Sequence, residues 1–314
     1  MKAIILKAFG SVDNLAATNI EIPEIADDEV LVRVKAFSIN PVDIKTRQGK
    51  ALANSLKKFD PIILGWDIAG IVERTGKDVD NLSKGQNVFG MVNFVGHGKA
   101  YAEYVAVPAK QLAIIPENSS YIEAAASSLA ALTAWQAFTR FGKLKKNDKV
   151  LIHGASGGVG HFAVQIANYL GAYVIGTSSE KNKEFVLSLG AKEHVDYKKQ
   201  KFENELNKLD FVLETIGHDN FKKSVKTLKN KGTIVNLPSG LTKSDEEVAN
   251  QKELNSCFFM SVYSNGNDMR KIAELLESKA VKPHIDKVYQ FNQIKEAHLK
   301  IESGRTKGKI VVEV

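Results

Sequence analysis

A glycine-rich segment in the middle of the chain constrains the fold more than any other feature. It reads Gly154-Ala155-Ser156-Gly157-Gly158-Val159-Gly160 and follows the apolar run 150–153. Apolar residues then recur at helical spacing up to Leu170, and a second apolar run covers 172–177. The order strand, glycine turn, helix, strand predicts a βαβ unit whose turn binds the phosphates of a dinucleotide. Glycine turns also serve plain chain reversal, so this interpretation depends on the complete βαβ context.

The residues after the second strand indicate which dinucleotide the unit would bind. An acidic side chain at this point would hydrogen-bond the ribose hydroxyls of NAD, but the chain has Ser178 there. Lys181 and Lys183 follow, and hydroxyl and ammonium groups suit a 2′-phosphate, so we expect NADPH in preference to NADH. The alternative is that both lysines are solvated charges at a helix start, and Glu180, directly before Lys181, opposes phosphate binding. Within the turn, the predicted cofactor-binding residues are Ser156, Gly157, Gly158 and Val159.

Composition sets the broad class of the protein. With 314 residues and 44% hydrophobic content, the chain is long enough for about two domains. The net charge of +7 comes from lysines scattered in short runs without interleaved aromatic residues, so we expect no nucleic-acid partner. Cys257 is the only cysteine, which excludes an intramolecular disulfide and a multi-cysteine zinc site.

Targeting and membrane segments are not expected from the sequence. Residues 1–7 resemble a strand interrupted by lysines rather than a signal peptide. No apolar stretch approaches the roughly 18 residues of a membrane helix. We therefore expect a cytoplasmic protein that has no membrane partner.

The pattern changes along the chain near Ser120. Residues 1–121 are rich in short alternating strands, whereas 122–265 alternate helices and apolar strands and predict an α/β doubly wound parallel sheet. The strands expected in this second region are 149–153, 173–177, 194–196, 211–214 and 233–237. The run Cys257–Val262 is expected to add a last strand, at an edge where a second subunit could pair to form a homodimer.

The C-terminal residues do not extend the alternating pattern. Helices are expected over 269–278 and 293–303, followed by a closing strand over 309–314. We expect this tail to return to the N-terminal β-rich domain. The predicted domains are therefore 1–121 with 266–314, and 122–265, with a cleft between the two lobes.

Several further segments, in order along the chain, accompany the glycine turn. They are Asn40-Pro41-Val42-Asp43, Leu64-Gly65-Trp66-Asp67-Ile68-Ala69-Gly70, Ala102-Glu103-Tyr104-Val105-Ala106-Val107, Leu132-Thr133-Ala134-Trp135, Leu189-Gly190-Ala191, Val195-Asp196-Tyr197 and 304–311. Together they resemble the zinc-independent quinone oxidoreductases and the enone or alkenal reductases of the medium-chain dehydrogenase/reductase superfamily. The resemblance covers essentially the whole chain, and Lys45 and Lys181-Asn182 point to the enone and alkenal reductases within it. It implies a GroES-like N-terminal domain, a Rossmann domain and NADPH as cofactor.

The resemblance also implies that no zinc is bound. Zinc-dependent relatives carry cysteine, histidine and glutamate ligands where this chain has Asn40, Trp66 and Asp67, and the seven histidines are spread singly. The expected chemistry is hydride transfer to a quinone or to the β-carbon of a small α,β-unsaturated carbonyl. Many quinone reductases of this kind have a tyrosine after an Arg-x-Gly turn, but residues 47–52 of this chain contain none.

The resemblance assigns roles to individual residues near the reacting groups. Lys45 would stabilise the oxyanion, the alternative being a lysine exposed in a basic stretch. Asn40 would orient the nicotinamide ribose or the substrate. Asp43 would share that role or, as we favour, cap the following helix.

Further cofactor contacts are expected from the same resemblance. Thr133 would contact the nicotinamide carboxamide, unless it is an ordinary helix residue. Tyr197 would lie against the adenosine phosphate, or else close a strand as a half-buried aromatic. Asn236, Leu237 and Pro238 end the fifth parallel strand, where open α/β sheets present their ligands.

Two other functions remain compatible with these residues. One is a non-catalytic, redox-sensing or structural protein that binds NADPH. The other is a zinc-free reductase of the alcohol dehydrogenase type.

Overall fold

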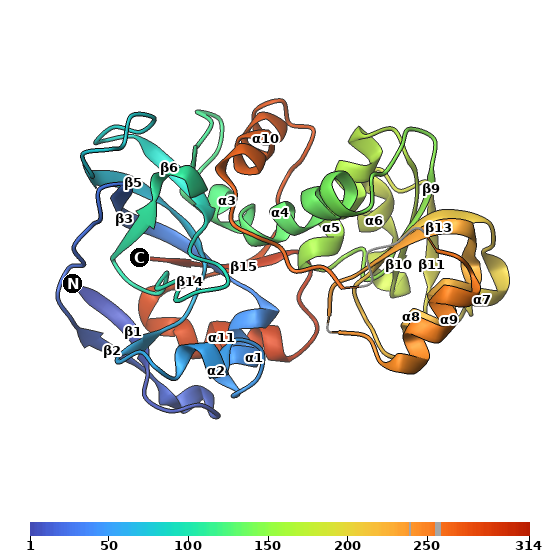
Figure 1. Ribbon diagram of the computed structural model, residues 1–314, viewed down its shortest axis with the longest axis horizontal. Helices are drawn as coiled ribbons and strands as arrows, with labels where there is room; N and C mark the ends of the chain where they lie inside the picture. Colours follow the sequence, from blue (N-terminus) through green and yellow to red (C-terminus); the bar gives the residue numbers. More distant parts are fainter. Residues whose placement is uncertain (239, 255–258) are drawn as a thin grey trace. The chain divides into compact units, whose positions relative to one another are not determined.

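The computed structural model describes residues 1–238, 240–254 and 259–314 and divides the chain into two compact units (Figure 1). The first comprises Met1–Leu132, Tyr263–Lys279 and Pro283–Val314, and the second comprises Thr133–Val262 and Ala280–Lys282. The first unit is therefore discontinuous in sequence.

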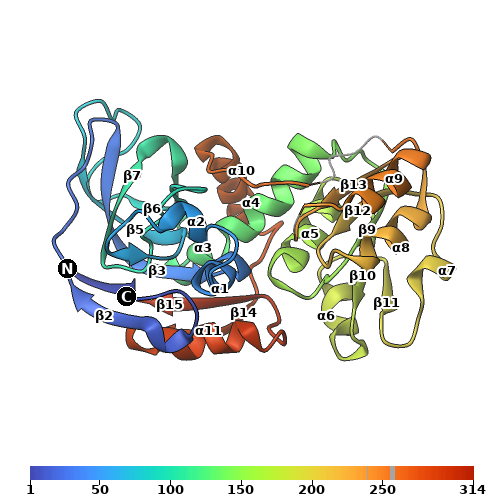
Figure 2. The ribbon, with the colours of Figure 1, turned by 60° about the horizontal axis from the view of Figure 1, so that its bottom comes forward.

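The second unit is built on a parallel sheet in the order β11-β10-β9-β12-β13. Helices α5 and α6 lie on one face of this sheet and α7, α8 and α9 on the other (Figures 1 and 2). This arrangement confirms the predicted doubly wound α/β fold. The elements are β9 (Lys149–Ile152), α5 (Gly158–Tyr169), β10 (Tyr173–Ser178), α6 (Lys183–Ser188), β11 (Glu193–Asp196), α7 (Phe202–Glu205), β12 (Leu209–Glu214), α8 (Asp219–Thr227), β13 (Leu228–Asn236) and α9 (Lys243–Gln251).

The sheet alternates its apolar side chains between the two helical layers. On the side of α7, α8 and α9, Leu151, Ile175 and Val212 of the strands pack with Phe221 and Val225 of α8. On the other side, α5 buries Phe162, Ala163, Ile166 and Ala167, which is the face that the helical spacing predicts. The carboxyl ends of the strands are thereby fixed at one edge.

The predicted edge strand Cys257–Val262 is tested only in part. Cys257 and Phe258 lie outside the described residues. Phe259 forms a parallel bridge with Asn236 at the end of β13, whereas Met260–Val262 are not in a strand. Pairing of a second subunit at this edge stays a prediction.

The first unit contains a sheet in the order β14-β15-β3-β5-β6-β8, with β7 also paired to β3, and a smaller sheet β2-β1-β4. These β-rich sheets are the GroES-like part of the fold, and the closing strand β15 inserts between β14 and β3. The strands are β1 (Lys2–Leu6), β2 (Leu15–Asn19), β3 (Glu29–Ile39), β4 (Ile62–Ile63), β5 (Asp67–Thr75), β6 (Asn87–Met91), β7 (Tyr104–Pro108), β8 (Ala113–Ile114), β14 (Ile285–Gln290) and β15 (Lys309–Glu313).

Short helices surround these sheets. Helix α3 packs against β3, β5 and β15, which is why residues 122–132 belong to the first unit rather than to the predicted second domain. Helix α11 packs on α1 and β15. The helices of the first unit are α1 (Pro41–Arg47), α2 (Ala53–Leu56), α3 (Tyr121–Ala126), α10 (Gly266–Glu277) and α11 (Ile294–Glu302). Helix α4 (Leu129–Gln136) starts in the first unit and belongs to the second from Thr133 onward, and a π-helical turn, Ala137–Phe141, continues it.

Candidate functional site

The glycine turn of the second unit joins β9 to α5. Gly154 has φ +59°, a conformation that glycine adopts without strain, and the N–H of Gly157 donates to the carbonyl of Gly154 at 2.8 Å. The helical ladder starts with the N–H of His161, which donates to the carbonyl of Gly157 at 3.0 Å. The N–H groups of Gly158 and Val159 therefore precede the ladder at the positive end of the helix dipole.

Gly160 shows how tightly the helix start is pressed onto the turn. A Cβ atom built there would lie 2.1 Å from the carbonyl oxygen of Gly154. Only glycine fits this approach, and the resulting cradle of backbone N–H groups suits a pyrophosphate. The local geometry fits a dinucleotide.

The side chains after β10 lie next to the turn. Asn182, in the 3-10 turn Glu180–Asn182, donates through Nδ2 to Ser156 Oγ at 3.0 Å. The Ser178 side chain is buried; its hydroxyl donates to the carbonyl of Ser179 at 3.1 Å and lies 2.8 Å from His194 Nε2. The Ser178 hydroxyl therefore already has protein partners at the position predicted for the cofactor.

The charges at this strand end are mixed. Lys181 is exposed, and Lys183 Nζ lies 4.0 Å from the Glu180 carboxylate. Lys199, which the sequence did not single out, approaches the same carboxylate at 3.7 Å. Glu180 therefore has two lysine partners, which reduces the repulsion it would exert on a phosphate.

Tyr197 follows the neighbouring strand β11. Its side chain is 59% exposed, so the alternative of a half-buried aromatic that closes a strand does not describe it. Its N–H donates to the carbonyl of Ser178 at 3.4 Å, which brings the ends of β10 and β11 together. Asn236, Leu237 and Pro238 lie at the same edge of the sheet, where β13 ends and the N–H of Leu237 donates to the carbonyl of Glu214.

In the first unit, Asn40 belongs to a buried polar cluster. Its Nδ2 donates to Asp67 Oδ2 at 2.7 Å, and its Oδ1 accepts from Lys309 Nζ. Asp67 also accepts from the Ser38 hydroxyl at 2.6 Å and from the Leu129 N–H at 2.8 Å. The Asn40 carboxamide is thus held in place by protein groups.

Asp43 caps α1, as the sequence analysis favours. Its Oδ2 accepts the N–H of Asn40 at 2.6 Å, and the side chain is fully buried. Burial raises the pKa of Asp43 to about 8, against the hydrogen bond from Asn40, and the nearby Asp67 raises it further. Burial likewise raises the pKa of Asp67, and the ammonium of Lys309 opposes this effect.

Lys45 and Thr133, the remaining predicted residues, occupy different settings. Lys45 lies in the last turn of α1 and is exposed. Thr133 lies inside α4 and is buried. The burial of Thr133 is compatible with the alternative of an ordinary helix residue.

The positions that hold zinc in metal-dependent relatives carry other chemistry here. Trp66 is buried, and its indole Nε1 donates to the carbonyl of Gly96 at 2.9 Å. Within the described part of the chain, no three His, Cys, Asp or Glu side chains cluster in a way that could hold a metal ion.

Sequence reasoning missed Asn182 and Lys309 as partners of site residues. Asn182 stands beside Lys181 in the resembling segment, so its position carried a signal. Lys309 contacts Asn40 across 269 residues, and no local pattern indicates that contact.

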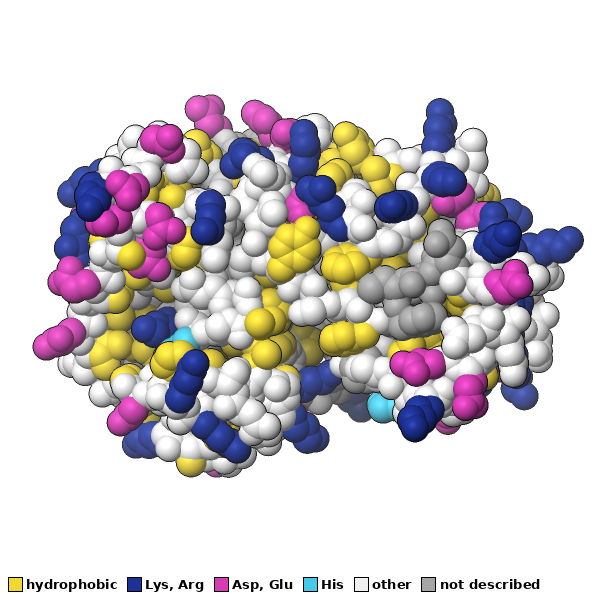
Figure 3. Space-filling model, in the orientation of Figure 1, with side chains coloured by type: hydrophobic (Ala, Val, Ile, Leu, Met, Phe, Trp, Pro, Cys, Tyr) yellow, Lys and Arg dark blue, Asp and Glu magenta, His cyan; other side chains and the backbone are white. Residues whose placement is uncertain are grey.

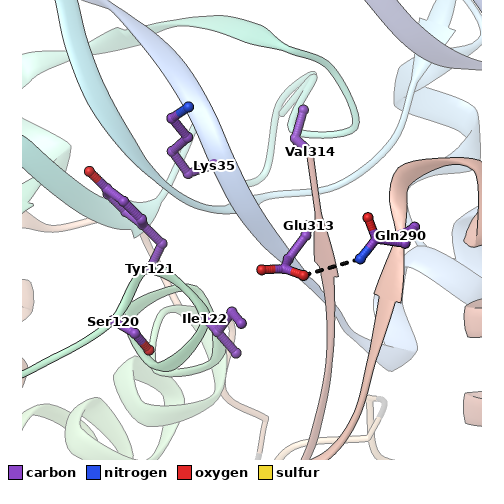
Figure 4. Close-up of a pocket in the computed structure, with 7 residues that line it drawn as sticks. All are labelled: Lys35, Ser120, Tyr121, Ile122, Gln290, Glu313 and Val314. Carbon is purple, nitrogen blue, oxygen red and sulfur yellow. Dashed lines mark hydrogen bonds between the residues drawn. The ribbon is translucent and has the colours of Figure 1, made fainter.

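A hollow of about 400 Å³ lies in the first unit between Lys35, Tyr121, Gln290 and Glu313 (Figure 4). Gln290 Nε2 donates to Glu313 Oε2 across it at 3.1 Å. It lies at the end of β15 opposite Lys309, about 15 Å away at the usual rise of a strand. None of the residues that line the hollow is a predicted site residue.

The face of the molecule drawn in Figure 3 does not carry charges of a single sign. On the side shown in Figure 3, lysine and arginine side chains are interspersed with acidic and uncharged ones. None of the described helices has the length and apolar composition needed to cross a bilayer. The absence of a nucleic-acid partner stays a prediction from the sequence.

Comparison with known proteins agrees with this geometry. Residues 26–117 match the family described as alcohol dehydrogenase GroES-like domain, and residues 189–312 match the one described as zinc-binding dehydrogenase. A 2-methylene-furan-3-one reductase of Solanum lycopersicum is 35% identical, over 99% of this chain and 79% of its own length. A chloroplastic NADPH-dependent alkenal/one oxidoreductase of Arabidopsis thaliana is 34% identical over the same shares.

A solved structure is similar over the whole chain. The quinone oxidoreductase from Coxiella burnetii has a TM-score of 0.94 and 34% identity, covering 100% of this chain and 99% of its own. The chain therefore belongs to the medium-chain dehydrogenase/reductase superfamily and is an oxidoreductase. Within that superfamily, its relatives include quinone oxidoreductases and alkenal and enone reductases.

Proposed function

We propose that this oxidoreductase uses NADPH to reduce small enones, alkenals or quinones without zinc. The observation that carries the proposal is the glycine turn, where Gly160 brings the start of α5 against the carbonyl of Gly154. The backbone N–H groups of Gly158 and Val159 would bind the pyrophosphate there. A relative that is 34% identical is named an NADPH-dependent alkenal/one oxidoreductase, which supports both the cofactor and the substrate class.

The preference for NADPH rests on the end of β10. In place of an acid that would bind the ribose of NAD, the chain has Ser178 with Lys181, Lys183 and Lys199 nearby. Since Glu180 contacts both Lys183 and Lys199, its charge is partly compensated. The excess of ammonium groups favours a 2′-phosphate over a free hydroxyl.

The reaction requires charge stabilisation on the acceptor. NADPH, when bound, would supply a hydride from its C4–H bond and become NADP+. The hydride would form a C–H bond at the β-carbon of an enone, the C=C electron pair would form a double bond to the carbonyl carbon, and the C=O π pair would move to the carbonyl oxygen. The Lys45 ammonium would stabilise this enolate oxygen, and solvent would protonate the α-carbon. With a quinone, the same cation would stabilise the phenolate oxygen.

The donor set supports chemistry without zinc. Zinc sites in proteins use thiolate, imidazole and carboxylate ligands, whereas the corresponding positions hold the carboxamide of Asn40 and the indole of Trp66. Asp67 offers a carboxylate, but it accepts hydrogen bonds from Ser38, Asn40 and Leu129. This set would bind zinc poorly.

One set of measurements tests the cofactor preference and the acceptor class together. Protein dialysed against a chelator is titrated with NADPH and NADH by nucleotide fluorescence and then assayed with an alkenal, a cyclic enone and 1,4-benzoquinone. We expect tighter binding of NADPH and acceptor-dependent oxidation of NADPH. Tight NADPH binding without turnover on any acceptor would favour a non-catalytic NADPH-binding protein, and recovery of activity only with added zinc would refute zinc-free chemistry.

A further inference from the structure

His153 is a buried histidine directly before the glycine turn, and the proposed reaction gives it no role. Its side chain is 2% exposed. Nδ1 lies 3.1 Å from Thr177 Oγ1 of β10, and Nε2 lies 2.9 Å from Ser224 Oγ of α8. The ring also packs against Phe202 of α7, with centroids 4.7 Å apart. Both ring nitrogens are therefore bonded to hydroxyl groups from different elements.

The direction of these hydrogen bonds is set at Glu214. The Ser224 hydroxyl donates its one proton to Glu214 Oε2 at 2.7 Å. The Ser224 oxygen must then accept from His153, so Nε2 carries the proton. Burial lowers the pKa of His153, with Glu214 opposing the shift, and a lowered pKa favours the neutral ring.

The other ring nitrogen completes the chain toward the glycine turn. Because Nδ1 of the neutral ring is an acceptor, the Thr177 hydroxyl must donate to it. Thr177 Oγ1 in turn accepts the N–H of Gly154 at 3.3 Å. Donors and acceptors thus alternate without conflict from Gly154 through Thr177, His153 and Ser224 to Glu214.

Glu214 extends this chain into the loop after β12. Its Oε1 accepts the N–H groups of Ile216 at 2.7 Å and Gly217 at 3.0 Å. The Thr215 hydroxyl returns to the carbonyl of His153 at 2.8 Å. Strands β9 and β12 are neighbours at the point where the strand order reverses, and open α/β sheets bind their ligands at such a point.

We propose that His153 is a positioning residue of the dinucleotide site, which holds Gly154 through Thr177 and ties the glycine turn to the loop after β12. The nature of the ligand rests on the proposed function, whereas the hydrogen-bonded chain does not. Glu214, from β12, is the one charged group that contacts the ring among the described residues. Thr177, Ser224 and Phe202 face the ring from β10, α8 and α7 and carry no charge.

The first experiment determines the protonated nitrogen of His153, and it requires neither cofactor nor activity. In protein labelled with 15N-histidine, long-range 1H–15N NMR at pH 7 should show His153 as the neutral tautomer protonated at Nε2. Ser224→Ala, which removes the hydroxyl that links the ring to Glu214, serves to assign the signal. A ring protonated at Nδ1, or a charged ring, would overturn the chain as derived.

The second experiment measures binding of NADPH by calorimetry. Thr177→Val should weaken binding about tenfold, because the Gly154 N–H and His153 Nδ1 both lose their partner. Thr177→Ser keeps the hydroxyl and should restore binding to within about twofold of the native protein. Thr227→Val is the matched control, since it removes another buried hydroxyl of this unit. That hydroxyl donates to the Ser224 carbonyl and is not part of the series of hydrogen bonds from Gly154 to Glu214.

The outcomes separate the two proposals. In turnover assays, Thr177→Val should raise the KM for NADPH and leave kcat within about twofold, whereas a general loss of structure lowers both kcat and the melting temperature. Equal affinity of Thr177→Val and the native protein, or failure of Thr177→Ser to restore it, would refute the positioning role. If the native protein binds neither NADPH nor NADH, the proposed function fails, and with it the role of the chain in binding.

Discussion

At the scale of single residues, α1 carries a buried acidic side chain, Asp43, and an exposed basic one, Lys45, two positions apart. Asp43 points inward and caps the helix through the Asn40 N–H, and Lys45 is exposed in the last turn. The buried acid is a structural group, whereas the ammonium lies on the exposed side of the helix. Substitutions at these two positions should therefore affect different properties.

Replacing Lys45 with alanine should lower kcat about 100- to 1,000-fold, because the developing oxyanion loses its cation. The dissociation constant of NADPH should stay within about twofold of the native value. Steady-state kinetics on an enone and fluorescence titration measure the two quantities. Lys57→Ala, another exposed lysine of the first unit, is the control. Unchanged kcat on every accepted substrate would remove Lys45 from the mechanism.

Asp43→Asn should flatten the pH dependence of stability. The pKa of Asp43 is raised from 3.8 to about 8 on folding, so the folded state retains a proton that the unfolded state releases between these values. The native protein therefore loses stability as pH rises through this window, by at most about 1.4 kcal/mol per pH unit from this group. Asparagine keeps an acceptor for the Asn40 N–H and has no proton to release.

Urea denaturation at several pH values between 5 and 8 provides the measurement. The free energy of unfolding of the native protein should fall relative to that of Asp43→Asn as pH rises. Parallel curves for the two proteins would show that Asp43 is ionised in the folded state across this range.

The sequence predicted the local role of Asp43 but not the long-range partners of its neighbours. A helix cap is set within four residues, so the run Asn40-Pro41-Val42-Asp43 indicates it. Lys309 reaches Asn40 from 269 residues away, and His153 meets Ser224 from 71 residues away. Such contacts depend on strand order and helix placement, which a single sequence does not specify.

At the scale of elements, the glycine turn depends on how closely α5 approaches it. Gly160→Ala places a Cβ 2.1 Å from the backbone oxygen of Gly154, and backbone yields less readily than a side chain. We expect a loss of more than about 2 kcal/mol of stability and loss of NADPH binding. Gly240→Ala is the control in the same unit, because among the described residues beyond its chain neighbours no atom lies within 4 Å of the added Cβ.

Thermal unfolding and fluorescence titration compare the two glycine variants. A Gly160→Ala protein with native stability and native NADPH affinity would show that the turn does not need the close approach.

Strand positions followed the sequence where apolar runs were continuous. Strands β9 and β10 lie where the apolar runs predict them, since buried parallel strands have little polar interruption. Strand β13 starts at Leu228, five residues before the predicted Thr233. The sequence did not predict this earlier start because the polar residues 229–232 have no strand pattern. The register between β12 and β13 also shifts at this point.

At the scale of the whole molecule, one chain forms two compact units, and the first unit is discontinuous in sequence. The sequence predicted the return of the C-terminal strand, which lies between β14 and β3. It did not predict that Ala280–Lys282 belongs to the second unit, where Gln165 accepts from the Lys282 N–H at 2.8 Å and donates to its carbonyl at 3.0 Å. A glutamine on a helix gives no sequence sign of such a contact.

Cofactor binding should stabilise the protein by mass action. At a concentration 100 times its dissociation constant, NADPH should add about 2.7 kcal/mol, which raises the melting temperature by several degrees. NADH at the same concentration should raise it less, because the end of β10 favours a 2′-phosphate. Differential scanning fluorimetry measures both shifts, and an equal or larger shift with NADH would contradict the proposed preference.

The transfer of a labelled hydride tests the central claim most directly. Chelator-treated protein is given an enone and NADPH that carries deuterium at both C4 positions, and the product is analysed by mass spectrometry and NMR. We predict one deuterium at the β-carbon of the saturated product, at a rate that added zinc does not increase. A product without deuterium, or reduction that occurs only when zinc is restored, would contradict the account.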